Sequence, residues 1–203
     1  MQAIILCGGM GTRLGEIAQT VPKLLLDIRG RTVLEWQLDF LKEAGVDDVV
    51  LASGHLHEAL YQAVGEGYGG VRIRYAKEEK KLDTGGAIQN AMQSLSTSLF
   101  FVLNGDVWLD WAASRMVDRF RPEMDGLLLG VWVDDISSYG ELVSDHYSRI
   151  TAFREKQPLH RPGYTICSSV TYILCFQVLG VRWAEVVRLF GGLVVGEEGK
   201  KGK

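Results

Sequence analysis

Apolar positions in the first three quarters of the chain alternate between runs typical of strands and spacings typical of helices. Residues 3–7 are all apolar, which predicts a strand over 2–7 that is buried on both faces. Leu34, Leu38 and Leu41 recur at the spacing of one helix face, so we predict a helix over 31–44. The same patterns predict strands over 46–53, 71–76, 99–103, 127–133 and 148–153, and helices over 55–64, 84–95 and 111–120.

This alternation of strand and helix determines the expected fold class. Strand, helix, strand, helix at this spacing indicates an α/β protein with a parallel sheet and helices on both of its faces. Such sheets bind ligands just beyond the carboxyl ends of their strands. The strand ends richest in glycine and polar residues are 8–13 and 104–106, so we expect the functional site there.

Composition and charge exclude several classes of protein for this chain. A chain of 203 residues with 47% hydrophobic content is expected to form one domain, over residues 1–203, with a substantial core. A net charge of -3 argues against a sequence-independent nucleic-acid binder. The three cysteines form no C-x-x-C pair, which favours a reduced, cytoplasmic setting without zinc or disulfides. No apolar run reaches membrane-spanning length and no signal peptide is visible, so no membrane association is expected.

The loop at residues 8–13 (Gly-Gly-Met-Gly-Thr-Arg) is the strongest chemical motif. Glycines expose backbone N–H groups that can form an anion nest, and Arg13 adds donors suited to phosphate oxygens. Lys23, held after Pro22, adds a second cation, so the set predicts a polyphosphate site. The alternative is a tight turn with two surface cations. The loop is neither a Walker A motif nor a good dinucleotide fingerprint.

Asp106 ends a buried strand in the sequence Asn-Gly-Asp. A carboxylate there can hold Mg²⁺, which takes one or two carboxylates together with phosphate oxygens and water. The alternative interpretation is an Asx-type turn, which is common after strands.

Asp83, Thr84 and Gly85 open a predicted helix. A helix N-terminus without bulky side chains can receive a base edge or a phosphate. The alternative is that Asp83 or Thr84 is only an N-cap.

Three other polar segments have weaker signals. Glu155 and Lys156 follow a short strand and could bind sugar hydroxyls and a phosphate, or could form a solvated ion pair. Tyr139 and Gly140 indicate a turn, and the charged run 77–81 indicates a solvated loop.

The order of these motifs resembles that of the sugar-1-phosphate nucleotidyltransferases. The pattern is most similar to guanylyltransferases for mannose 1-phosphate and D-glycero-D-manno-heptose 1-phosphate, and it covers residues 1–160. The resemblance implies a Rossmann-like three-layer sandwich with a mostly parallel mixed sheet. The motifs that carry it are LCGGMGTRL at 6–14, PK at 22–23, TGGA at 84–87, LNGD at 103–106 and EK at 155–156.

The resemblance also implies a reaction and a set of residue roles. A nucleoside triphosphate, with GTP preferred, and a sugar 1-phosphate of mannose or heptose type would give an NDP-sugar and pyrophosphate. Lys23 would stabilise charge at the α-phosphate, Arg13 would grip the leaving pyrophosphate, and Asp106 would bind Mg²⁺. The nucleotide would contact Leu6, Gly8, Gly9, Gly11, Thr12, Arg13, Thr84 and Gly85; the sugar would face Tyr139, Gly140 and Glu155, and its phosphate would bind Lys156. A homo-oligomer is compatible with the resemblance.

The C-terminal part departs from the family pattern. The family's Asn-containing motif is absent from 163–172, and no aspartate follows Asp145, so residues 165–203 are interpreted as divergent or truncated. Two alternatives therefore stay open: a nucleotide- or NDP-sugar-binding regulatory homologue without turnover, and a thymidylyl, uridylyl or cytidylyl enzyme for a glucose-type 1-phosphate. A dinucleotide-dependent oxidoreductase is the weakest reading.

Overall fold

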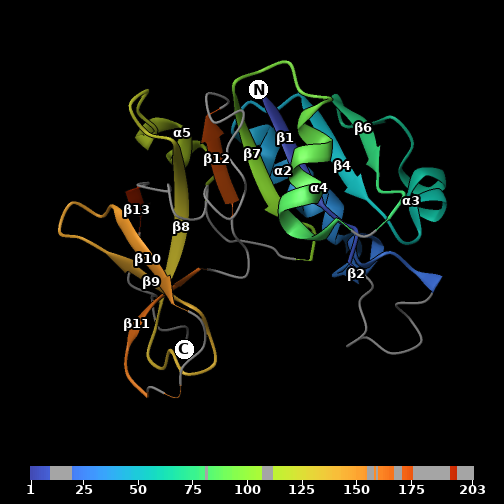
Figure 1. Ribbon diagram of the computed structural model, residues 1–203. Helices are drawn as coiled ribbons and strands as arrows, with labels where there is room; N and C mark the ends of the chain where they lie inside the picture. The colour runs from blue at the N-terminus through green and yellow to red at the C-terminus, as the bar shows by residue number, and fades with distance from the viewer. Residues whose placement is uncertain are drawn as a thin grey trace.

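A computed structural model describes residues 1–9, 20–80, 82–106, 112–154, 158, 160–166, 171–175 and 193–195. Within these ranges one 11-stranded mixed sheet runs through the molecule (Figure 1). Its strands lie in the order β10 (Ile150–Arg154), β9 (Glu141–Ser144), β11 (Gly163–Ile166), β8 (Gly126–Val133), β12 (Thr171–Cys175), β7 (Leu99–Asn104), β1 (Gln2–Leu6), β4 (Asp48–Ser53), β6 (Val71–Lys77) and β5 (Gly67–Tyr68), with β13 (Leu193–Val195) beside β8.

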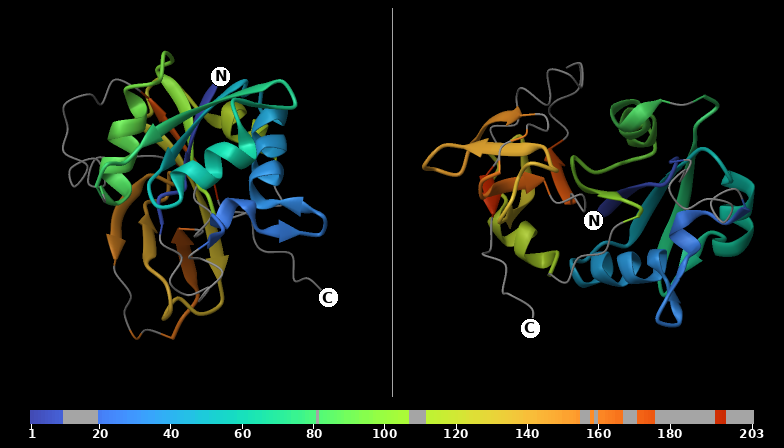
Figure 2. Two further views of the ribbon diagram at one scale, coloured as in Figure 1. Left: turned by 90° about the vertical axis from the view of Figure 1, so that its right-hand side faces the viewer. Right: turned by 90° about the horizontal axis from the view of Figure 1, so that it is seen from below.

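The parallel part of the sheet consists of β7, β1, β4 and β6. Leu6 is level with Ala52 on one neighbour and Asn104 on the other, so the carboxyl ends of these strands meet at one edge. Beyond β7 the pairings are antiparallel, apart from that of β13 with β8. Figure 2 shows this second half, in yellow and orange, beside the helix-covered parallel half. The expected mixed α/β sheet is confirmed.

Helices cover both faces of the parallel strands, which makes the three layers. Alternate residues of a strand face opposite sides, so Ile5 packs with helix α2 (Val33–Glu43) and Ile4 packs with helix α4 (Asp83–Met92). Helix α3 (His57–Val64) and helix α5 (Ser114–Arg119) add to the core on the α2 side. The buried contacts of the two main helices are Leu34, Leu38 and Leu41 from α2, and Ala87, Ile88 and Ala91 from α4.

Helix α2 begins and ends as its local sequence dictates. Thr32 and Glu35 form a capping box, in which each side chain accepts a hydrogen bond from the other residue's backbone N–H. Gly45, with a φ of +78°, follows the helix in the left-handed conformation that glycine adopts most easily.

Several short elements carry too little periodicity to be predicted from the pattern. Strands β9 and β11 have 4 residues each, and β12 has 5. A hairpin of β2 (Asp27–Ile28) and β3 (Arg31–Thr32) projects from the body between Lys23 and α2 (Figure 2). Among the described residues, no helix has the length and apolar character needed to cross a bilayer.

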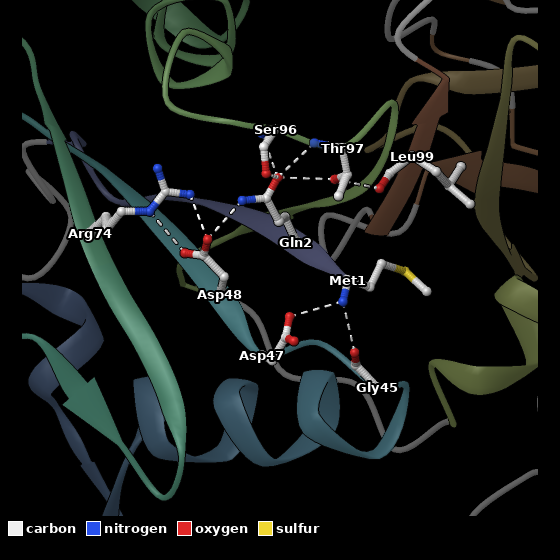
Figure 3. A network of polar contacts seen from close by, with 9 residues as sticks. All are labelled: Met1, Gln2, Gly45, Asp47, Asp48, Arg74, Ser96, Thr97 and Leu99. Atoms are coloured by element: carbon white, nitrogen blue, oxygen red, sulfur yellow. Dashed lines mark hydrogen bonds and ion pairs between the residues drawn. The ribbon is translucent and has the colours of Figure 1, made fainter.

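A partly buried polar network ties the amino ends of the parallel strands together (Figure 3). Gln2 Oε1 accepts hydrogen bonds from the backbone N–H groups of Ser96 at 2.7 Å and Thr97 at 2.9 Å. Asp48 accepts from Gln2 Nε2 and from Arg74 Nη2, both at 2.7 Å. This network lies at the end of β1 opposite the glycine loop, so it supports the sheet rather than the pocket.

Candidate nucleotide and metal site

A pocket of about 270 Å³ opens at the carboxyl ends of the parallel strands, beside the N-terminus of α4. It therefore lies where an open α/β sheet is expected to bind its ligand. Six of the residues predicted for the site line it: Leu6, Gly8, Gly9, Lys23, Thr84 and Asp106.

Lys23 and Asp106 meet in this pocket. Lys23 begins the 3-10 helix η2 (Lys23–Leu25) directly after Pro22, and Asp106 follows β7. Lys23 Nζ lies 3.0 Å from Asp106 Oδ2, and the side chains are 29% and 52% exposed. When both groups face the pocket, the cation can bind a phosphate and the carboxylate can bind a metal ion.

The donor set around Asp106 fits a sparsely held Mg²⁺. In the described part of the chain, no group of three His, Cys, Asp or Glu side chains gathers into a cage. Mg²⁺ is usually held by one or two carboxylates together with substrate phosphates and water. Asp106 is a half-exposed carboxylate that lines the pocket, so it could supply one such ligand.

The turn before Asp106 requires glycine. Gly105 N–H donates to Leu6 O at 2.8 Å, so the turn rests directly on the end of β1. A Cβ at Gly105 would lie 2.7 Å from Leu6 O and 3.2 Å from the methyl carbons of Leu24. The turn therefore lies close against the β1 backbone and the buried Leu24, and this close approach sets the position of Asp106.

Glu78 is a site residue that the sequence analysis missed. The run 77–81 was interpreted as a solvated loop, and for Glu78 this is wrong because its side chain lines the pocket. Its Oε1 lies 2.7 Å from the place where a Cβ on Gly8 would stand, and its Oε2 accepts from Leu82 N–H at 3.2 Å. The signal available was its position directly after β6, the same rule that identified Asp106 after β7.

Cys7 also borders the pocket. Its Sγ lies 3.1 Å from Ala52 O, and desolvation by burial, with a smaller contribution from the charge of Glu78, raises the pKa of the thiol. Cys7 therefore stays protonated, as a small packing residue does, and is not a reactive thiol.

The N-terminus of α4 is not capped by Asp83 or Thr84. Asp83 is already the first residue of the helix, with a φ of +55°, and the N-cap residue is Leu82, which makes no side-chain capping bond. The interpretation of Asp83 or Thr84 as a simple N-cap is therefore wrong. Asp83 and Thr84 line the pocket instead, and Gly85 follows them inside the helix.

Two of the residues expected to face the sugar, Tyr139 and Gly140, lie between β8 and β9, in the other half of the sheet. Tyr139 lies in a turn, with its N–H donating to Ile136 O at 2.9 Å, and is 46% exposed. Gly140 O accepts from Thr165 Oγ1 at 2.7 Å. Neither is among the described residues that line the pocket. Gly11, Thr12, Arg13, Glu155 and Lys156 lie outside the described residues.

Comparison with known proteins agrees with this geometry. A family model described as nucleotidyl transferase matches residues 2–188, so the chain belongs to that family. The interpretation of residues 1–203 as one domain, with 165–203 divergent or truncated, stays a prediction.

Among curated relatives, a D-glycero-alpha-D-manno-heptose 1-phosphate guanylyltransferase from Campylobacter jejuni is 33% identical over 156 residues, which are 77% of this chain and 69% of the relative. A mannose-1-phosphate guanyltransferase from Aspergillus fumigatus is 36% identical over 186 residues, 88% of this chain. The chain spans 50% of that relative's length.

Among solved structures, HddC from Yersinia pseudotuberculosis complexed with GMP-PN is 26% identical, with a TM-score of 0.73. The alignment covers 96% of this chain and 82% of the HddC chain. The likeness therefore extends over nearly the whole chain.

Proposed function

We propose that this protein is a Mg²⁺-dependent sugar-1-phosphate guanylyltransferase. A phosphate oxygen of a mannose- or heptose-type 1-phosphate attacks the α-phosphorus of GTP, the bond from that phosphorus to the bridging oxygen of the β-phosphate breaks, and pyrophosphate leaves. The products are a GDP-sugar and pyrophosphate. Because no covalent enzyme intermediate is needed, catalysis consists of positioning and stabilisation of charge.

The observation that carries the proposal is the presence of Lys23 and Asp106 in one pocket, 3.0 Å apart. Lys23 would stabilise the negative charge that develops at the α-phosphate. Asp106 would hold Mg²⁺, which when bound supplies a Lewis acid for the phosphate oxygens. The glycines at positions 8 and 9 let the nucleotide approach the end of β1.

The choice of guanine rests on Glu78. Strand β6, which precedes Glu78, and strand β7, which precedes Asp106, are three strand spacings apart, roughly 14 Å, and the Glu78 side chain reaches back to Gly8, which follows β1. The carboxylate of Glu78 repels a polyphosphate, so the phosphates belong at the Lys23 end and the base belongs toward Glu78. Guanine alone among the common bases presents a ring N–H and an amino group side by side, and a carboxylate can accept from both. The printed names of the relatives, which are guanylyltransferases, support the same choice.

The proposal is tested by pyrophosphate release with GTP, CTP, UTP and dTTP against mannose, heptose and glucose 1-phosphates, with Mg²⁺. We expect release with GTP and a mannose- or heptose-type acceptor. Release only with another nucleotide would contradict the assignment of the base. Binding of GTP by calorimetry with no release from any pair would indicate a nucleotide-binding homologue without turnover.

The role of Glu78 has a matched control in the same loop. Glu78→Gln should lower kcat/KM for GTP by about 10- to 100-fold, because one charge-assisted acceptor is lost at the base. Glu79 is exposed and does not line the pocket, so Glu79→Gln should leave kcat/KM unchanged. Equal effects of the two substitutions would contradict the assignment of Glu78 to the base.

A further inference from the structure

Helix α2 carries a polar side chain at a position where its spacing calls for an apolar one. Gln37 is three residues after Leu34 and four before Leu41, so it shares the face that packs on the sheet. It is 2% exposed, as deeply buried as its leucine neighbours. A buried amide has to form hydrogen bonds to offset the cost of its burial, whereas an apolar residue of similar volume would pack there with no polar group to satisfy.

The side chain of Gln37 reaches the end of strand β7. Its Nε2 donates to the backbone oxygen of Asn104 at 2.8 Å, a contact across 67 positions of sequence. Asn104 is the last residue of β7 and the second residue before Asp106. Helix α2 is therefore joined by a hydrogen bond to the segment that presents the carboxylate.

Two bonds from different elements thus hold this turn. The end of β1 holds it through Leu6 O and Gly105 N–H at 2.8 Å, and α2 holds it through Gln37 and Asn104 O. The turn continues β7, whose Asn104 is already level with Leu6 in the sheet, and the Gln37 bond adds a contact from the helix layer, in a direction that the sheet does not supply. The orientation of the turn determines where the Asp106 carboxylate lies relative to Lys23.

We propose that Gln37 is a positioning residue of the active site: by holding the carbonyl of Asn104, it orients the Asp106 carboxylate toward the metal and phosphates. This inference rests on the proposed function of Asp106. Some residues do not touch a metal themselves but orient the side chains that bind it. Mutation of such residues commonly lowers metal affinity about 10- to 100-fold. A displacement of a catalytic group by about 1 Å is enough to cost a large part of the rate.

The test uses Gln37→Met, which keeps the length of the side chain and removes the donor. Mn²⁺ binding is measured by electron paramagnetic resonance in the presence of a non-hydrolysable GTP analogue, together with kcat and KM for GTP. We expect the Mn²⁺ dissociation constant to rise about 10-fold, and kcat to fall by a similar factor while KM for GTP stays within about threefold. An unchanged Mn²⁺ dissociation constant would overturn the inference.

Leu41→Ala is the matched control. Leu41 is fully buried on the same helix face, one turn farther along α2. Its truncation should lower the thermal midpoint through lost packing and leave the Mn²⁺ dissociation constant within about twofold. If Leu41→Ala and Gln37→Met weaken Mn²⁺ binding equally, the effect comes from lost packing around α2, and the positioning role of Gln37 is wrong.

Two further measurements separate this inference from the proposed function. Asp106→Asn must weaken Mn²⁺ binding at least as much as Gln37→Met; if it has no effect, the metal role of Asp106 fails. Crystal structures test Gln37 without any turnover: the distance from Lys23 Nζ to Asp106 Oδ2, now 3.0 Å, should lengthen in Gln37→Met and persist in Leu41→Ala. An unmoved Asp106 in Gln37→Met would overturn the positioning role even if the protein proved inactive.

Discussion

Lys23 Nζ lies 3.0 Å from Asp106 Oδ2, although 83 positions separate the two residues in the sequence. The contact forms because β1 and β7 pair in parallel and Leu24, next to Lys23, packs against Gly105. Before substrate arrives, each side chain neutralises the other. We expect a nucleotide and its metal ion to replace this ion pair with two new ones, from Lys23 to phosphate and from Asp106 to the metal.

The first prediction concerns competition for Asp106. Lys23→Met should strengthen Mn²⁺ binding to the nucleotide-free protein by about 2- to 5-fold, since a partly exposed ion pair of modest strength no longer neutralises the carboxylate. Calorimetric titration measures this directly. Lys80→Met, at an exposed lysine outside the pocket, should have no effect. Equal Mn²⁺ affinity in wild type and Lys23→Met would show that the lysine does not compete.

The second prediction concerns turnover. Lys23→Ala should lower kcat by at least about 100-fold while the dissociation constant for GTP changes much less, because the charge is needed most in the transition state. Steady-state kinetics and calorimetry with a non-hydrolysable analogue separate the two effects. Equal losses in binding and in kcat would assign Lys23 to ground-state binding only.

The third prediction concerns the turn at Gly105. Gly105→Ala should lower the free energy of unfolding by about 1–3 kcal/mol, because the new methyl group would collide with Leu6 O and with Leu24. Urea denaturation measures the change. At Gly9 a Cβ would meet no atom of the described residues within 4 Å, so Gly9→Ala should leave stability nearly unchanged. A stable Gly105→Ala would mean that the turn can shift away from β1.

The fourth prediction concerns the opposite end of the sheet. Gln2→Leu should lower the free energy of unfolding by about 1–3 kcal/mol, because it removes the oxygen that accepts from the N–H groups of Ser96 and Thr97. Ser96→Ala removes only a 3.3 Å bond from the hydroxyl and keeps the backbone bond, so its effect in the same urea titration should be smaller. The reverse order would show that the backbone donors are satisfied in another way.

The fifth prediction concerns alkaline pH. Burial raises the pKa of Tyr75 to about 12, above the value of about 10 expected in the unfolded chain. The folded state holds this proton more tightly, so its stabilising contribution is complete below pH of about 10 and disappears as pH rises from about 10 to 12. In Tyr75→Phe the free energy of unfolding should therefore fall less steeply between pH 9 and 11, a range that spans the pKa of about 10 of tyrosine in the unfolded chain.

Urea titrations at several pH values measure this slope, and Tyr147→Phe is the control because Tyr147 is 65% exposed. Tyr75→Phe also removes the 2.6 Å bond from the hydroxyl to Gly65 O, which should cost about 1 kcal/mol at neutral pH. An identical pH slope in all three proteins would exclude Tyr75 as the source of the alkaline loss.

The pattern of apolar positions was enough to predict the parallel half of the fold and several residues of the site. Continuous apolar runs indicated β1, β4 and β7, and the leucine spacing indicated α2, because a strand or a helix buried on a known face leaves that periodicity in the chain. Gly8, Lys23 and Asp106 were identifiable because each directly follows such a run or belongs to an ordered motif.

Contacts between distant segments set which of these residues meet. Glu78 and Glu79 are chemically alike and adjacent, and only the placement of β6 beside β4 turns Glu78 toward Gly8. Gln37 follows the apolar spacing of α2 but is itself polar, and its bond to Asn104 spans 67 positions. Local periodicity reports the face on which a side chain lies, whereas the partner on that face is set by contacts between segments far apart in the chain. The sequence therefore predicted where the site lies, and the packing of β1, β7 and α2 decided how its carboxylate is held.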